Sequence, residues 1–217
     1  MDYNLKKKFF NEMEGHEHLD KRYGKKGLSI IEIKVTLFYL LNQFMKYSFK
    51  NNIKPILMHG GLIGYFFNNQ ILPWDDDLDL IICDKESKKN LKNENFDNYI
   101  IEVNPNCNIY SIDDKLNKIS ARVISKINGV FIDITYFIED INKKVLFCKD
   151  KHIYKIEDIY YDIPKKKLKI GLFHNIPIYI PNNIVNCLVK EYGKNVLKPY
   201  YKNYIFNSKN KTWYKKK

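Results

Sequence analysis

The sequence predicts an α/β (α+β) domain in which helices and strands share one hydrophobic core. Apolar residues recur at helical spacing across residues 28–49. A short apolar run at 55–58 leads into a glycine pair, and residues 129–137 form a strand rich in β-branched side chains. The chain has 217 residues, 45% of them hydrophobic, which is enough to bury the core of one such domain.

Two regions are expected, and the first lies outside the folded core. Residues 1–27 are polar, charged and interrupted by glycine, and we interpret them as a flexible lead-in to a single domain over residues 28–217. This lead-in carries the histidine pair His16 and His18. Two histidines at that spacing can hold a metal, but solvated side chains on a mobile segment are the favoured interpretation.

The composition argues against specific recognition of nucleic acid. The formal net charge is +12, but Arg22 and Arg122 are the chain's two arginines and every other basic side chain is lysine. Base edges are read mainly through bidentate arginine contacts. We therefore expect solvated lysines with a weak attraction for polyanions and no specific nucleic-acid partner.

The apolar stretches predict no transmembrane segment. Residues 28–47 are interrupted by charged side chains, and residues 55–67 are shorter than the roughly 20 residues of a spanning helix. The first residues lack the apolar core of a signal peptide. The cysteines are widely spaced and form no CxxC pair: Cys83, Cys107, Cys148 and Cys187. These features predict buried thiols in a reducing compartment and a soluble, cytoplasmic protein.

The first half of the chain contains two expected helices and a strand. The helix at 28–49 has Ser29 as its N-cap, with Glu32 three residues later in the pattern of a capping box. The strand at 55–58 enters Gly60-Gly61, from which a second helix is expected to run through residue 67. A glycine-rich strand-to-helix turn lets backbone N–H groups approach a phosphate. A tight turn needs glycine in any case. The glycine pair therefore indicates a phosphate site mainly because an acidic segment follows it in the chain.

The acidic segment begins shortly after the second helix. The sequence Pro-Trp-Asp-Asp-Asp-Leu-Asp, which starts at Pro73, places four carboxylates in five residues directly ahead of an apolar run. A strand has a side-chain period of two, so Asp77 and Asp79 point to one face with Cα atoms roughly 6–7 Å apart. Both carboxylates could then bind one hard cation or two. The alternative is a solvated acidic turn, which is disfavoured because Asp79 lies inside the apolar run.

The second half of the chain is richer in strand signals. A charged surface segment covers residues 84–95, and a helix is expected from Asn182 or Asn183 to Gly193. The aromatic, basic segments 199–204 and 212–214 are expected to dock against the domain rather than to stack on a ligand. Further β-prone runs are found at 99–103, 109–112, 119–127, 145–149 and 167–173.

Asp133 is the one charge in the strand at 129–137, which comes after a predicted hairpin turn at Asn128-Gly129. A buried unpaired carboxylate is costly, so Asp133 needs a partner. Two partners fit the pattern. One is a salt bridge to Arg122, roughly opposite across the hairpin, and the other is a metal ion for which Asp133 is the third carboxylate ligand.

These motifs together resemble the LicD family, which groups bacterial phosphocholine transferases with the fukutin-related proteins. Gly-Gly-Leu-Ile-Gly precedes Ile-Leu-Pro-Trp-Asp-Asp-Asp-Leu-Asp-Leu, and a hydrophobic strand with a single Asp comes later. The segment Glu191-Tyr192-Gly193-Lys194-Asn195 is similar to the family's closing segment. The resemblance covers about residues 30–214. It implies a nucleotidyltransferase-like mixed β-sheet flanked by helices, of the DNA polymerase β type.

The resemblance also implies a metal-dependent transfer from a nucleotide-activated donor. The glycine turn would hold the donor phosphates, and Asp77 and Asp79 would bind two Mg²⁺ ions, with Mn²⁺ as an alternative. Asp133 would complete one metal site and help to deprotonate the acceptor hydroxyl. These three aspartates are the expected catalytic and metal-binding residues. The expected substrate-binding residues are Gly60, Gly61, Trp74, Asp75, Asp76 and Arg122.

Two departures from the family pattern affect the phosphate site. Gly61 stands where many relatives carry Ser or Thr, which removes one hydroxyl contact. The usual basic residues ahead of Pro-Trp are replaced by Phe67-Asn68-Asn69-Gln70. Arg122 or a lysine would then have to bind the donor phosphates, or the donor differs.

The expected function is an Mg²⁺-dependent phosphotransfer. A phosphocholine, phosphoribitol or glycerol phosphate unit would move from a CDP-linked alcohol donor to a hydroxyl of a glycan or glycoconjugate acceptor. One alternative is a nucleotidyltransferase that adds NMP from an NTP to a small molecule or protein. The other is a catalytically idle module that binds polyanions in a salt-sensitive way. Donor preference and Mg²⁺ dependence distinguish the three.

Overall fold

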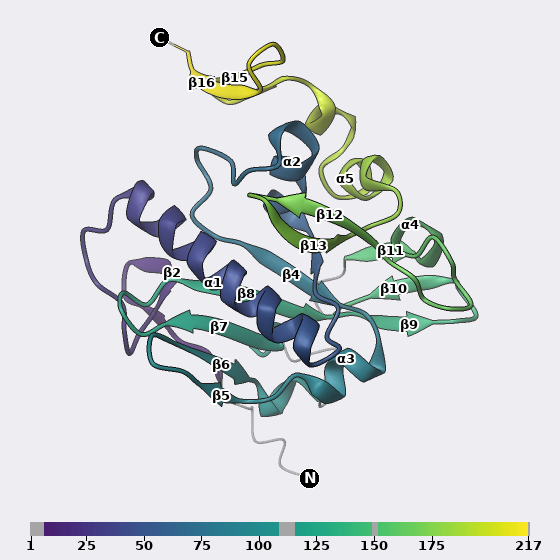
Figure 1. Ribbon diagram of the computed structural model, residues 1–217, viewed down its shortest axis with the longest axis horizontal. Coiled ribbons are helices and arrows are strands. Elements are labelled where there is room, and N and C mark those ends of the chain that lie inside the picture. Colours follow the sequence, from purple (N-terminus) through teal and green to yellow (C-terminus); the bar gives the residue numbers. More distant parts are fainter. Residues whose placement is uncertain (1–6, 109–115, 149–151, 217) are drawn as a thin grey trace.

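The computed structural model describes residues 7–108, 116–148 and 152–216, and its centre is an eight-stranded mixed sheet (Figure 1). Two neighbouring pairs, β13–β3 and β4–β8, run parallel, and the other pairs are antiparallel. The strands, in their order across the sheet, are β12 (Lys169–Phe173), β13 (Ile176–Ile180), β3 (Ile56–Leu57), β4 (Asp79–Ile82), β8 (Phe131–Tyr136), β7 (Ala121–Ser125), β6 (Tyr99–Val103) and β5 (Glu94–Asn95). The predicted mixed sheet flanked by helices is confirmed.

Helix α1 (Ile30–Lys50) lies across one face of this sheet (Figure 1). The predicted capping box is present, because the Ser29 hydroxyl accepts from the Glu32 N–H and the Glu32 carboxylate accepts from the Ser29 N–H. The apolar side of the helix is fully buried at Leu37, Leu40, Leu41 and Phe44. This face of the sheet is therefore a closed apolar layer.

The opposite face carries the shorter helices. Side chains alternate along the central strands, so that Leu57 and Leu80 pack in the core beneath α1 while Ile56 and Ile81 belong to a second apolar cluster. That second cluster is covered by α2 (His59–Asn68), α4 (Ile156–Ile159) and α5 (Ile184–Tyr192), and by a small sheet of β9 (Ile138–Asp140), β10 (Val145–Phe147) and β11 (Ile153–Lys155). Side chains of β4 and β8 that do not point towards α1 therefore point to the sheet face that is covered by these shorter helices.

The remaining predicted elements match in part. The charged surface segment contains α3 (Lys85–Asn90), and Asn183 caps α5 as expected. The hairpin turn between β7 and β8 has Gly129 at φ +78°, the left-handed region that glycine adopts freely. The expected run at 109–112 and the end of the run at 145–149 lie outside the described residues. Two 3₁₀ turns, Pro105–Asn108 and Lys194–Leu197, complete the secondary structure before the C-terminal strands.

The N-terminal segment differs from the mobile lead-in that the sequence predicts. Residues 7–27 include a hairpin of β1 (Glu12–Met13) and β2 (His16–Asp20), which packs on the sheet. Phe10 and Leu19 are only 4% and 5% exposed, and the Asp20 N–H donates to the Gly129 carbonyl at 2.8 Å. Two apolar side chains anchor this polar segment: Phe10 packs with Ile100, Ile124 and Phe131, and Leu19 pairs with Val130.

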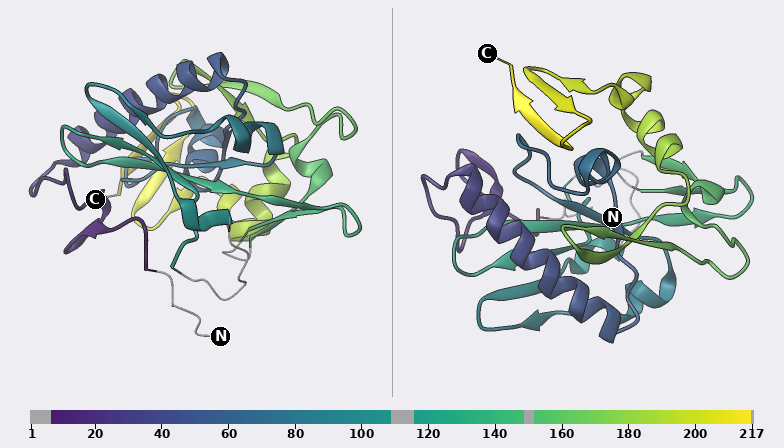
Figure 2. Two further views of the ribbon diagram at one scale, coloured as in Figure 1. Left: turned by 90° about the horizontal axis from the view of Figure 1, so that it is seen from below. Right: turned by 45° about the horizontal axis from the view of Figure 1, so that its top comes forward.

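The C-terminal segment forms an antiparallel three-stranded sheet of β14 (Tyr200–Tyr201), β15 (Tyr204–Asn207) and β16 (Thr212–Lys215). Figure 2 (right) shows it beside α2. Its aromatic side chains dock as predicted, with Tyr201 stacked on Trp74 at a ring-centroid distance of 4.9 Å and Trp213 edge-on to Phe67 at 4.9 Å. The docked sheet forms a wall next to the acidic segment.

In the described part of the chain, no helix has both the length and the apolar character needed to cross a bilayer. Cys83 and Cys187 are buried thiols, as the cysteine spacing predicts.

Gly64 offers a test of how closely α2 approaches the loop ahead of the acidic segment. A Cβ at Gly64 would lie 2.0 Å from the Gln70 carbonyl oxygen, so Gly64→Ala must push backbone apart. We expect the free energy of unfolding in urea to fall by roughly 1–3 kcal/mol. Lys46→Ala, which places alanine on the exposed side of α1, is the control and should be nearly neutral. An unchanged stability for Gly64→Ala would contradict this packing.

Candidate functional site

The acidic segment and the strand with Asp133 meet at the centre of the sheet. Strands β4 and β8 are parallel neighbours, and Asp79 lies directly opposite Asp133 in their register. The Asp133 N–H donates to the Leu78 carbonyl at 3.1 Å, which extends this pairing ahead of β4. By the side-chain period of a strand, Asp79 shares the face of Ile81 and points away from α1. Asp77 lies just ahead of the strand rather than inside it.

The carboxylates of the segment perturb one another. Burial, and then the neighbouring charges of Asp77, Asp133 and Asp75, raise the pKa of Asp79 to about 7, although His59 opposes the shift. Burial and the charges of Asp77 and Asp76 likewise raise the pKa of Asp75 to about 7. Carboxylates this close cannot all ionise without a cost, so the cluster favours either bound protons or a bound cation.

The glycine turn faces this cluster through Gly60. A Cβ at Gly60 would lie 2.4 Å from Asp75 Oδ2, so any side chain there would displace the carboxylate. Gly61 faces the core instead, where a Cβ would meet Leu57 and Leu78 methyl groups at 2.7 and 2.8 Å. A side chain at position 61 would therefore require these leucine side chains to shift. The first N–H groups of α2 have no intrahelical acceptors and no side-chain cap at Met58.

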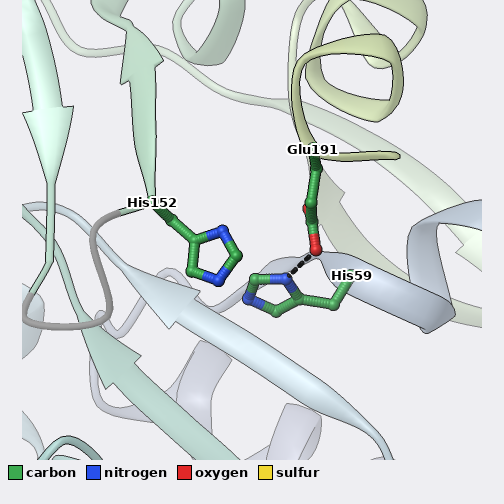
Figure 3. Close-up of side chains that lie close together, drawn as sticks. All are labelled: His59, His152 and Glu191. Atoms are coloured by element: carbon green, nitrogen blue, oxygen red, sulfur yellow. Dashed lines mark hydrogen bonds and ion pairs between the residues drawn. The ribbon is translucent and has the colours of Figure 1, made fainter. Parts of the chain in front are cut away.

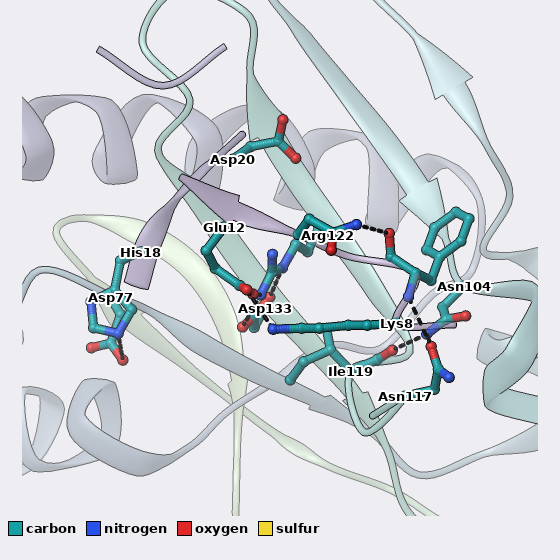
Figure 4. A network of polar contacts seen from close by, with 12 residues as sticks. Lys8, Glu12, His18, Asp20, Asp77, Asn104, Asn117, Ile119, Arg122 and Asp133 are labelled. Atoms are coloured by element: carbon teal, nitrogen blue, oxygen red, sulfur yellow. Dashed lines mark hydrogen bonds and ion pairs between the residues drawn. The ribbon is translucent and has the colours of Figure 1, made fainter. Parts of the chain in front are cut away.

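Asp133 is bound by Arg122, which lies opposite it across the β7–β8 hairpin (Figure 4). The Arg122 Nε donates to Asp133 Oδ1 at 2.6 Å, and Nη2 donates to Glu12 Oε1 at 2.8 Å. The guanidinium carbon also lies 3.7 Å from the centre of the Phe131 ring, and Arg122 is only 3% exposed. The salt-bridge alternative for Asp133 is thus formed, and Nε and Nη2 of the buried Arg122 are taken by Asp133 and Glu12, whereas its buried Nη1 has no hydrogen-bond partner among the described residues.

The N-terminal hairpin reaches the acidic segment through His18. Its Nδ1 lies 2.9 Å from Asp76 Oδ1, and its Nε2 lies 3.8 Å from Asp77 Oδ2. Burial opposes protonation of His18, but the charges of Asp77 and Asp76 raise its pKa overall. Sequence reasoning singled out the pair His16 and His18 but missed this contact, because nothing local indicates that the hairpin folds back.

A cleft of about 540 Å³ opens beside the acidic segment. The motif contributes Gly60, Trp74 and Asp75 to its lining, and the C-terminal sheet with the turn before it contributes Lys198, Tyr201, Lys202 and Trp213. A somewhat larger hollow of about 630 Å³ lies elsewhere, against β5 and β6, and contains no motif residue. The cleft next to the motif is therefore the better candidate for a substrate site.

The predicted aspartates differ in how well they fit Mg²⁺. Asp77 and Asp79 supply the hard oxygen donors that Mg²⁺ prefers, and their pKa values are raised by burial and by neighbouring carboxylates. Asp133 is already held by Arg122. Among the described residues, a single group of three candidate metal ligands has all its ligand atoms within 4.8 Å of one another, and it consists of His59, His152 and Glu191. Sequence reasoning missed this group, whose members are far apart in the chain.

Comparison with known proteins agrees with the motifs. The family model of the LicD/FKTN/FKRP nucleotidyltransferase domain matches residues 52–183, more than half of the chain. Mannosyltransferase regulator 4 of Saccharomyces cerevisiae is 29% identical over 154 residues. That match covers 60% of this chain and 13% of the yeast protein, so the chain corresponds to a small part of this relative. The family match includes the glycine turn, the acidic segment and β8, but neither the N-terminal hairpin nor the C-terminal sheet.

The raised pKa of Asp79 gives a pH test. Between its unfolded pKa of 3.8 and its folded pKa of about 7, the native state binds more protons, so this group lowers the free energy of unfolding as the pH rises. With divalent cations removed by EDTA, Asp79→Asn should therefore be more stable than the wild type at pH 8, by on the order of 2 kcal/mol. The advantage should shrink towards pH 5, where the wild-type carboxyl is protonated.

Thermal unfolding at both pH values measures this difference. Asp97→Asn makes the same chemical change at an exposed position and serves as the control. If Asp79→Asn changed the stability by the same amount at pH 5 and at pH 8, the pKa of the Asp79 carboxyl would not be raised in the folded state.

Proposed function

Because the chain belongs to the LicD/FKTN/FKRP nucleotidyltransferase-domain family, we propose that it transfers a phospho-alcohol unit from a CDP-activated donor to a hydroxyl of a glycan. The family implies transfer of phospho-sugar or phospho-alcohol groups in general, and phosphocholine, phosphoribitol and glycerol phosphate are the units we expect. One observation carries the proposal: the carboxylates of Asp75, Asp77 and Asp79 crowd together, and Asp75 lies against Gly60 at the start of α2 and lines an open cleft.

In this proposal Asp77 and Asp79 hold Mg²⁺, for which Mn²⁺ could substitute. The ion would neutralise charge on the donor phosphates and help to align the acceptor hydroxyl with the leaving group. Asp133 would contribute a third carboxylate and help to take the proton of the acceptor hydroxyl. Arg122 would act on it as a positioning residue, because its Nε fixes one carboxylate oxygen. In this proposal Arg122 therefore positions Asp133, whereas the sequence alone had predicted that it binds the donor phosphates.

The remaining parts of the site would bind the donor. The N–H groups at the start of α2 that lack intrahelical acceptors suit a phosphate. The Asp75 carboxylate lies against Gly60, so the phosphate would bind there together with the cation or would displace that side chain. Lys198 and Lys202 line the cleft and can supply the positive charge that residues 67–70 lack. Phe67 packs against Trp213 and so helps to hold the C-terminal sheet in place. Trp74, stacked on Tyr201, offers an aromatic surface for a base or a sugar ring.

A second candidate function is suggested by the yeast relative. Its name describes a regulator of a mannosyltransferase, which supports a role for this chain as a binding module without turnover. Such a module would retain the fold and bind a nucleotide or glycan ligand, but it would release no product. A third candidate, NMP transfer from an NTP, uses the same carboxylates and differs in the donor.

The first test is turnover with a panel of CDP-alcohols and NTPs, with Mg²⁺ and glycan acceptors. CMP release from one CDP-alcohol is expected, and Asp77→Asn or Asp79→Asn should reduce it by at least about 100-fold because the metal loses a ligand. Asp97→Asn is the control and should retain activity. Pyrophosphate release from an NTP would favour nucleotidyl transfer. No release with any donor and acceptor would favour the binding module.

Lys202 tests the assignment of the cleft. Lys202→Ala should raise the KM for the donor by roughly 3–10-fold, about 0.7–1.4 kcal/mol, and leave kcat nearly unchanged, because it removes binding common to the ground and transition states. Lys209→Ala, an equally exposed lysine outside the cleft, should have no effect on either constant. Identical kinetics for both variants would place the donor elsewhere.

A further inference from the structure

We propose that His59, His152 and Glu191 bind a transition-metal ion of the Zn²⁺ class, at a site separate from the acidic segment. The three residues come from different elements, which meet on the face of the sheet opposite α1. His59 is the first residue of α2, His152 directly precedes β11, and Glu191 lies in the last turn of α5 (Figure 3). A metal held by all three would join these elements.

The geometry is close to that of a metal site. The candidate ligand atoms all lie within 4.8 Å of one another, and the two imidazole centres are 5.0 Å apart. His59 Nδ1 is 2.6 Å from Glu191 Oε1, and Figure 3 shows its other ring nitrogen turned towards His152. Zinc–nitrogen and zinc–oxygen bonds are about 2.0–2.2 Å, so two ligands of one ion lie roughly 3–3.5 Å apart. Small side-chain rotations are enough to reach that spacing.

The surroundings hold the ligands in place. The Tyr154 hydroxyl donates to Glu191 Oε2 at 2.8 Å, an outer hydrogen bond of the kind that orients metal-binding carboxylates. The side chains of His59 and Glu191 are only 16% and 8% exposed. His59 also has φ +53°, an unfavourable backbone conformation for a non-glycine residue.

The chemistry of the ligands distinguishes this site from the acidic segment. Two imidazole nitrogens and one carboxylate are a set used by zinc enzymes, with a fourth position left for water. Imidazole suits Zn²⁺, Co²⁺ and Ni²⁺, whereas Mg²⁺ prefers oxygen ligands such as Asp77 and Asp79. The chain would therefore hold two metals of different kinds, with His59 next to the glycine turn of the Mg²⁺ site.

The competing explanation is a metal-free ion pair. Glu191 already pairs with His59 and accepts from Tyr154, so these contacts could serve only to join α2, α5 and β11. That explanation gives His152 no role, although its ring lies against His59. It also predicts no saturable binding of a transition metal. A titration therefore separates the two.

The test is a Co²⁺ titration of the full chain after treatment with EDTA. We expect one Co²⁺ per chain, the intense visible absorption of a four-coordinate ion, and its loss when Zn²⁺ displaces Co²⁺. His152→Ala and Glu191→Gln should abolish saturable binding. Tyr154→Phe should weaken it by roughly 10–100-fold, as outer-shell changes do. His16→Ala removes an exposed histidine outside the group and should bind Co²⁺ normally.

Two further measurements distinguish loss of this site from unfolding and from Co²⁺ binding at the acidic segment. His152 is half-buried and not part of the Glu191 pair, so His152→Ala should keep the wild-type circular dichroism spectrum. Asp77→Asn should retain the Co²⁺ absorption, and excess Mg²⁺ should not displace the ion. The proposal fails if the wild type shows no saturable Co²⁺ absorption, if the three variants leave it unchanged, or if Mg²⁺ or Asp77→Asn removes it.

Discussion

The parallel pairing of β4 with β8 is the constraint on which the rest of the site depends. Its register sets Asp79 opposite Asp133, in the middle of a sheet whose other face is closed by α1. Strand geometry then sends both carboxylates to the face with the shorter helices. A shift of one residue would bury them beneath α1 among leucines, so the apolar pattern of the two strands also fixes the position of the charges.

The fold reduces the repulsion that this pairing creates by bringing in opposite charges from elsewhere. Arg122 lies beside Asp133 in the next strand, and it is itself shared with Glu12 of the N-terminal hairpin. His18 of the same hairpin lies beside Asp76 and Asp77. Burial, and then neighbouring carboxylates, still raise the pKa values of Asp75 and Asp79 to about 7. Of these carboxylates, Asp75 lines the cleft.

Local signals were sufficient to predict much of this structure. The capping box of α1, the hairpin at Gly129 and the strand with Asp133 each depend on neighbouring residues, and all three were predictable. The prediction of a mixed sheet rested on the motifs and the family resemblance, and not on hydrophobic periodicity. The LicD-like segment also identified the aspartates, whose roles remain proposals.

The parts that sequence reasoning missed depend on long-range contacts. Phe10 and Leu19 anchor an otherwise polar segment against β6, β7 and β8, which are distant in sequence. His59 and Glu191 pair across 132 residues. For Arg122, both alternatives were visible in the sequence, but choosing between them required knowing that its side chain is buried between aromatic rings.

The C-terminal sheet lies outside the stretch that matches the family, yet it forms one wall of the cleft. Stacked and edge-on aromatic rings hold it against Trp74 and Phe67. The carboxylates and the wall thus belong to separable parts of the polypeptide. Randomising exposed positions of residues 200–215 that make no aromatic contact with the domain would consequently vary one wall of the cleft while the acidic segment stays constant, which makes this appendage the natural starting point for redesign.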